Sequence, residues 1–283
     1  MRKVKMIIAR SGVIDQVLTP PEVIVESAKQ YNEEYIPLTI EHDIRNPPIG
    51  RVVSAKVIVL DDGTHLLQGE AEIFEESDNL DLLPKNHKSI KIRAEEVDNF
   101  LVLGNQTFEE DDDVADIYQE LRELGAKDRN RVYHEDSVEP ISLLIIGFGI
   151  FALQGISNGF FSKLGEDLYE KLKLKLKNIF EKKSLKQREN LLNFQFFVIF
   201  VNSDASRTIE VNVVITNPSQ NDLDGFFTFV PAMLDTMLSG LPVDDLDICR
   251  VVFSYEFTQL KLLYVLRSDG VPISLYRIER NDC

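Results

Sequence analysis

An uncharged, strongly apolar stretch from Ile141 to Phe161 sets the tightest limit on how this chain can fold. A membrane-spanning helix needs about twenty apolar residues. This stretch reaches that length only by including polar side chains such as Gln154 and Asn158. Its glycines weaken a helix further, because glycine has a low helix propensity. We therefore predict a buried strand over residues 141–146 followed by a glycine bend, and keep membrane contact through 141–183 as an alternative.

The net charge limits the partners. The chain of 283 residues has 47 acidic and 31 basic side chains, which gives a formal charge of −16. Such a surface repels phosphate backbones, so we expect a protein substrate or partner and no nucleic acid. Self-association is left open. The lysines of an amphipathic helix predicted over 162–183 form a local positive face, which keeps a membrane-active effector of a phage-defence system as an alternative.

Residues typical of metal and cofactor sites are sparse. The two cysteines, Cys249 and Cys283, form neither a CxxC motif nor a disulfide framework. No HxH or HxxxH spacing joins the four histidines, which are His42, His65, His87 and His134. No glycine-rich phosphate loop occurs. We therefore expect no metal and no cofactor. Because no signal-peptide pattern follows Met1, we expect a cytoplasmic protein.

Hydrophobic periodicity predicts an α+β protein in three parts. Residues 1–155 are rich in alternating strands, with a hairpin turn at Asp62-Gly63, and predict a mostly antiparallel domain with flanking helices. Residues 156–189 predict the amphipathic helix and a charged linker. Residues 190–283 predict a small α/β domain of unknown role, in which strands surround one helix over Phe226–Ser239 that is ended by Gly240.

Four short motifs follow one another within residues 1–155. They are PLTIEHD at 37–43, PIGRV at 48–52, KSIKI at 88–92 and VEPISLL at 138–144. In this order they resemble the prohead proteases of tailed phages, a family that shares its fold with the herpesvirus assembly proteases. The resemblance implies a barrel-like protease domain over residues 1–155. It also implies a serine endopeptidase that cuts a protein partner, such as a capsid or scaffold protein.

The resemblance also implies roles for individual residues. Ser89 is the candidate nucleophile and His42 the candidate general base, since an imidazole that titrates near neutrality can accept the serine proton. The third member of the catalytic group stays open. Glu139 is the first choice because it precedes the closing strand, and Asp136 and His134 are alternatives. The herpesvirus proteases use a second histidine, which keeps His134 open.

Two departures from the family pattern favour another function. Lys91 stands where the family has a small residue, and the acidic insert at 105–131 is longer than expected. A catalytically inactive binding or assembly protein on the same fold is therefore the main alternative. If the protein is active, its oxyanion hole needs donors near Ser89, for which Arg51 and Arg93 are candidates.

Overall fold

The structure, a computed structural model, describes most of the chain. The described residues are 1–14, 17–40, 43–75, 88–92, 102–105, 141–153, 155–156, 170–178, 189–201 and 206–273, with a few further positions between 119 and 180. They fall into two compact units. Those of unit 1 lie within Met1–Lys91 and Leu266–Ile273, and those of unit 2 lie within Ile92–Arg131 and Glu139–Val265.

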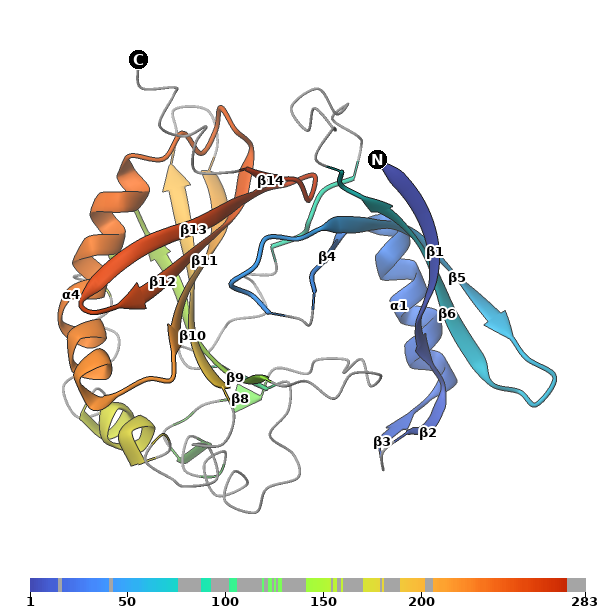
Figure 1. The fold of residues 1–283 in the computed structure, drawn as a ribbon, viewed down its shortest axis with the longest axis horizontal. Coiled ribbons are helices and arrows are strands. Elements are labelled where there is room, and N and C mark those ends of the chain that lie inside the picture. The colour runs from blue at the N-terminus through green and yellow to red at the C-terminus, as the bar shows by residue number, and fades with distance from the viewer. Residues whose placement is uncertain are drawn as a thin grey trace. The chain divides into compact units, whose positions relative to one another are not determined.

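Unit 1 contains an antiparallel four-stranded sheet (Figure 1). The strand order is β1 (Arg2–Arg10), β6 (His65–Ile73), β5 (Gly50–Val59) and β4 (Ile36–Leu38). A separate small hairpin joins β2 (Gly12–Ile14) to β3 (Val17–Thr19). The predicted hairpin at Asp62-Gly63 is confirmed as the β5–β6 connection, where Gly63 has a φ of 85° that glycine adopts without strain.

The barrel-like closure expected for the first domain is not among the described strands. These strands form an open sheet whose outer members are β1 and β4. The exposed edge strand β1 carries Arg2, Lys3 and Lys5, and such charges discourage pairing with another chain. The α+β class is confirmed, whereas closure of a barrel stays a prediction.

Helix α1 (Pro21–Glu33) packs on one face of this sheet. It begins with proline at its first position, where no backbone N–H is needed, and with Glu22 near the positive end of the helix. Its buried side, Ile24, Ala28 and Tyr31, contacts the sheet residues Val52, Ala55, Leu67 and Ala71. At the end of the helix, the Asn32 amide exchanges hydrogen bonds with the backbone of Ala55. These polar contacts fix the helix to β5.

Unit 2 contains a mixed sheet with β9 (Ile141–Ala152) and β10 (Glu189–Val201) near its centre. From β10 the order runs through β11 (Ser206–Thr216) and β12 (Ile248–Glu256) to β13 (Gln259–Arg267). On the other side of β9 lie β7 (Val102–Asn105) and β8 (Lys127–Asp128). The pairs β9–β10 and β11–β12 are parallel, so each requires a crossover connection. The last residues of β13 and all of β14 (Pro272–Ile273) belong to unit 1.

Helix α4 (Gln220–Ser239) makes the β11–β12 crossover and covers one face of the unit 2 sheet (Figure 1). Its start is fixed by a capping box, in which Ser219 and Asp222 each bond to the backbone of the other. Its buried side is aromatic: the Phe226 ring stacks on Phe194 of β10 with centroids 3.8 Å apart. The helix therefore begins earlier than the predicted stretch from residue 226.

The apolar stretch forms the predicted strand, and that strand is longer than expected. Leu144, Ile145 and Ile146 are buried in β9, which continues past Gly147 and Gly149 to Ala152. The pairing with β10 shifts register at the glycines, where Gly149 has a φ of 69°. Among the described residues, no helix is long and apolar enough to cross a membrane.

The division into units differs from the domain boundaries predicted near residues 155 and 189. Strand β9, expected to close the first domain, pairs with β10 and belongs to unit 2. Conversely, residues 266–273 of the expected C-terminal domain belong to unit 1. The described part of the predicted amphipathic helix, residues 170–178, buries Leu172 and Leu176, and its Lys173 forms an ion pair with Asp224 of α4.

Candidate functional site

The candidate nucleophile Ser89 lies in unit 1 on a short segment held by its backbone. Ser89 itself is exposed. The backbone N–H of the next residue, Ile90, donates to the carbonyl of Ser268 at 2.6 Å. The N–H of Lys91 donates to the buried carboxylate of Glu34 at 3.2 Å, and its ammonium pairs with Glu33 at 3.0 Å. An exposed hydroxyl therefore stands beside a backbone tied to two different parts of the unit.

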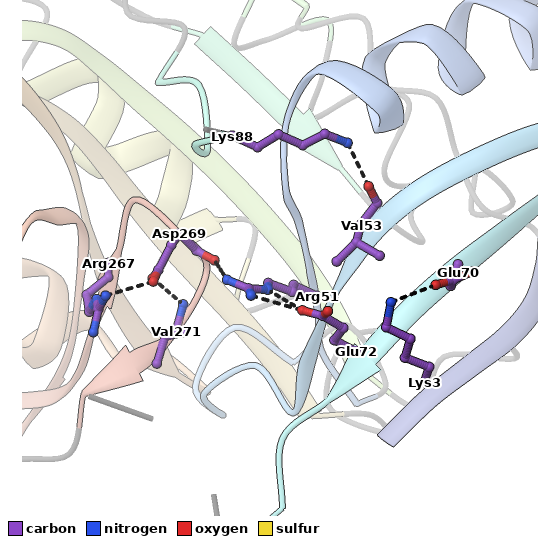
Figure 2. Close-up of polar contacts among 9 residues, drawn as sticks. All are labelled: Lys3, Arg51, Val53, Glu70, Glu72, Lys88, Arg267, Asp269 and Val271. Carbon is purple, nitrogen blue, oxygen red and sulfur yellow. Dashed lines mark hydrogen bonds and ion pairs between the residues drawn. The ribbon is translucent and has the colours of Figure 1, made fainter. Parts of the chain in front are cut away.

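Lys88 fixes the other side of this segment. Its ammonium donates a 2.6 Å hydrogen bond to the carbonyl of Val53 (Figure 2). Val53 lies where the β5–β6 register shifts between Val52 and Ser54, so its carbonyl is outside the regular ladder. Partial burial lowers the pKa of Lys88. The segment is thus anchored immediately before Ser89 as well as after it.

The candidate base His42 lies outside the described residues, but its neighbour Asp43 is buried and well connected. The Asp43 carboxylate accepts hydrogen bonds from the backbone N–H and the guanidinium of Arg45, the latter at 2.8 Å. It also accepts one from the amide of Asn46. A carboxylate that accepts from its own loop stabilises a tight turn. Asp43 therefore has a structural role and fixes the chain directly after His42.

Most of the other residues considered for the site lie outside the described part of the chain. The structure does not describe the candidates Glu139, Asp136, His134 and Arg93, nor His87. The catalytic group around Ser89 therefore stays a prediction. His65 is described, and its ring Nδ1 lies 3.0 Å from the carbonyl of Gly63 in the hairpin turn. It therefore takes part in a local turn contact.

Arg51 has a different role from the one expected. Its side chain is only 1% exposed. Two of its nitrogens donate to the Glu72 carboxylate at 2.9 and 3.0 Å, and a third donates to the carbonyl of Asp269 at 2.6 Å (Figure 2). The guanidinium also lies 4.3 Å from the centre of the Tyr35 ring. A buried guanidinium needs such partners, and these contacts use it as a structural anchor rather than an oxyanion donor.

The Asp269 carbonyl that binds Arg51 belongs to a compact turn over residues 267–271. Its backbone is closed by hydrogen bonds from Arg267 N–H to the Val271 carbonyl and from Gly270 N–H to the Arg267 carbonyl, both 3.0 Å. The Asp269 carboxylate accepts from the guanidinium of Arg267 at 2.8 Å and from the N–H of Val271 at 3.2 Å (Figure 2). Gly270, with a φ of 82°, allows the sharp bend.

A buried polar cluster in unit 2 was missed by sequence reasoning. The Glu210 carboxylate accepts from Gln195 at 2.7 Å, from Asn212 at 2.9 Å and from Arg250 at 3.0 Å. Asn193 in turn donates to Asn212 at 2.8 Å. The signal was present in the sequence, because polar residues recur at every second position of two otherwise apolar strands. Since β10 and β11 are antiparallel neighbours, this spacing places the polar side chains on one face.

Comparisons of the chain with protein-family models, with curated proteins and with solved structures find no match.

Proposed function

We propose that this protein is a serine endopeptidase that acts on a protein substrate, with residues 1–155 resembling the prohead proteases. Ser89 is the nucleophile, His42 the general base and Glu139 the third member. The observation that carries the proposal is the exposed Ser89 hydroxyl on a segment held at Lys88, Ile90 and Lys91. A nucleophile must be accessible and yet fixed in position, and this segment has both properties.

The proposed chemistry follows from the groups involved. His42 accepts the proton of the Ser89 hydroxyl as its oxygen attacks the scissile carbonyl carbon. The protonated imidazole then gives this proton to the leaving amine, and water releases the acyl group from Ser89 in a second step. Glu139 orients the imidazole and stabilises its charged form.

A fluorophosphonate probe tests the nucleophile, because it reacts covalently with activated serines. We expect the wild type to be labelled on Ser89 and Ser89→Ala to be unlabelled. Ser206→Ala is the matched control, since Ser206 is an exposed serine in unit 2 and its loss should leave labelling unchanged. Labelling that persists in Ser89→Ala, as mapped by peptide mass spectrometry, would remove Ser89 from the mechanism.

The same assay separates the candidates for the other two roles. His42→Ala should reduce the labelling rate by about a hundredfold or more, the usual contribution of a general base. Among Glu139→Gln, Asp136→Asn and His134→Ala, only the substitution of the true third member should reduce it strongly. A fall confined to His134→Ala would support a second histidine in place of Glu139.

An inactive binding or assembly protein is the second candidate, and Lys91 favours it. Lys91 stands two residues after Ser89, at a position where the family resemblance calls for a small residue. Its charged side chain forms an ion pair with Glu33. Under this proposal the wild type is not labelled by the probe, and Lys91→Ala does not create labelling. Labelling of wild-type Ser89 would contradict it.

A further inference from the structure

A hydrogen bond joins the residue after the candidate nucleophile to a segment far along the chain. The Ile90 N–H donates to the carbonyl of Ser268 at 2.6 Å, and Ile90 is buried. This bond fixes the peptide plane between Ser89 and Ile90, because the amide nitrogen and the preceding carbonyl belong to one rigid unit. The position of Ser268 therefore controls the backbone on which the Ser89 hydroxyl is carried.

Ser268 is in turn held by the turn over residues 267–271. Hydrogen bonds close this turn on both sides of Ser268, from Gly270 to Arg267 and from Arg267 to Val271. The Asp269 carboxylate adds bonds to Arg267 and to the Val271 N–H. A turn with this many internal contacts moves as one body.

One buried side chain connects this turn to the sheet of unit 1. Arg51, on β5, donates from one side of its guanidinium to the Asp269 carbonyl and from the other to Glu72 on β6 (Figure 2). The same turn approaches Arg51 at Gly270, where an added Cβ would lie 3.5 Å from the arginine side chain. The planar guanidinium can hold both partners at once, which a lysine ammonium does not do in the same geometry.

We propose that Arg51 is a positioning residue for Ser89, acting through the 267–271 turn and the Ile90 amide, so that residues 266–273 are part of the framework of the candidate active site. That Ser89 is the nucleophile rests on the proposed function. The mechanical link from Arg51 to Ile90 stands on the hydrogen bonds alone.

Two glycine substitutions test the link with matched backbone strain. Gly270→Ala forces a side chain onto a φ of 82° within the turn, and Gly63→Ala does the same at a φ of 85° in the β5–β6 hairpin. The added Cβ at Gly63 meets no atom within 4 Å. Both variants should therefore lose similar global stability, but only Gly270→Ala disturbs the turn that holds Ile90.

Hydrogen exchange of the Ile90 amide is the first measurement. We expect Gly270→Ala to speed exchange by about tenfold relative to Gly63→Ala, because the acceptor carbonyl of Ser268 is no longer held. Arg51→Lys, which keeps the positive charge beside Glu72 and loses the bond to Asp269, should have the same effect. Equal exchange at Ile90 in Gly270→Ala and Gly63→Ala would overturn the inference, whether or not Ser89 reacts.

The second measurement is the rate at which the fluorophosphonate probe labels Ser89, which shows whether a disturbed turn slows the reaction of the nucleophile. In Gly270→Ala and Arg51→Lys the maximal labelling rate should fall by about tenfold, while the probe concentration for half-maximal rate stays the same, as expected for lost alignment of the nucleophile. Equal maximal rates in Gly270→Ala and Gly63→Ala would overturn the positioning role. A wild type that does not label contradicts the proposed function, and exchange at Ile90 then still decides the mechanical link.

Discussion

The carboxylate of Glu210 accepts a 3.0 Å hydrogen bond from the guanidinium of Arg250 on the neighbouring parallel strand. The same carboxylate receives the amides of Gln195 and Asn212, so it gathers three donors on one face of the unit 2 sheet. Glu210 is buried and Arg250 is largely so. Glu210 is thus the shared acceptor of these three donors.

Glu210→Ala is therefore expected to destabilise unit 2 by about 3–5 kcal/mol, the usual effect of removing one partner from a buried ion pair. Urea unfolding followed by circular dichroism measures it. Asp247→Asn is the control, because it removes the charge from the more exposed 2.7 Å pair with Arg207 and should cost about 1 kcal/mol or less. Equal losses in the two variants would contradict the importance of the cluster.

Substitutions in the turn between β12 and β13 are expected to stabilise the folded protein. Phe257 and Thr258, its two central residues, have φ values of 50° and 62°, which side chains with a Cβ rarely adopt. Phe257 is also 88% exposed, so little burial is lost when it is replaced. The double substitution Phe257→Asn, Thr258→Gly should raise the free energy of unfolding by about 1 kcal/mol, because Asn-Gly suits this turn. A lower denaturation midpoint would contradict this prediction.

Gly225 in α4 faces the hydroxyl of Tyr255 on β12. An alanine Cβ at this position would overlap the Tyr255 hydroxyl, which has no hydrogen-bond partner among the described residues. Gly225→Ala should therefore destabilise the wild type, since the clash of about 1–3 kcal/mol exceeds the gain in helix propensity.

A double-mutant cycle checks this contact. In a Tyr255→Phe background, Gly225→Ala should become neutral or stabilising by up to about 1 kcal/mol, because the hydroxyl is gone and the helix propensity remains. Denaturant unfolding of the four proteins gives the coupling energy. An unchanged effect of Gly225→Ala in both backgrounds would contradict the prediction.

Tyr31 on α1 gives unit 1 an alkaline pH dependence. Burial, with a smaller contribution from the Glu34 carboxylate, raises the pKa of Tyr31 from 10.0 to about 12. The folded state therefore holds this proton more tightly than the unfolded state does. The resulting stability is fully present below pH 10 and falls by roughly 3 kcal/mol as the pH rises towards 12.

Tyr31→Phe should remove this part of the pH dependence. The measurement is the free energy of unfolding at several values between pH 9 and 11.5 for the wild type and the variant. Because lysines also titrate in this range, the difference between the two proteins, rather than either slope, carries the test. Parallel curves for the two proteins would contradict the assignment to Tyr31.

Local patterns predicted most elements, because their information lies within a few residues. The alternation in β5 and β6 with Asp62-Gly63 between them predicted the hairpin, and a proline at the first position, as in α1, is typical of a helix start. The capping pair Ser219 and Asp222 carried the same kind of information for α4. The predicted start at residue 226 was therefore late, although the signal was in the sequence.

Non-local pairing was not predictable in this way. Strand β9 reads as a continuous apolar run, which indicates burial but does not specify the neighbour. Its parallel pairing with β10 depends on the crossover between them, and β9 belongs to unit 2. At the candidate site, the sequence indicated Ser89 through its motif. It gave no sign that Ser268 would hold the next residue.

The membership of residues 266–273 in unit 1 has a consequence during protein synthesis. Arg51 and Asp269 are 218 residues apart in the chain, and a ribosome adds about 5–20 residues per second. The sheet and α1 of unit 1 emerge first, but roughly 10 to 40 seconds pass before the partner of Arg51 exists. During that time the Ile90 amide has no Ser268 to bind. If Ser89 is the nucleophile, a nascent chain is restrained from cutting its neighbours until residues 266–273 have been synthesised.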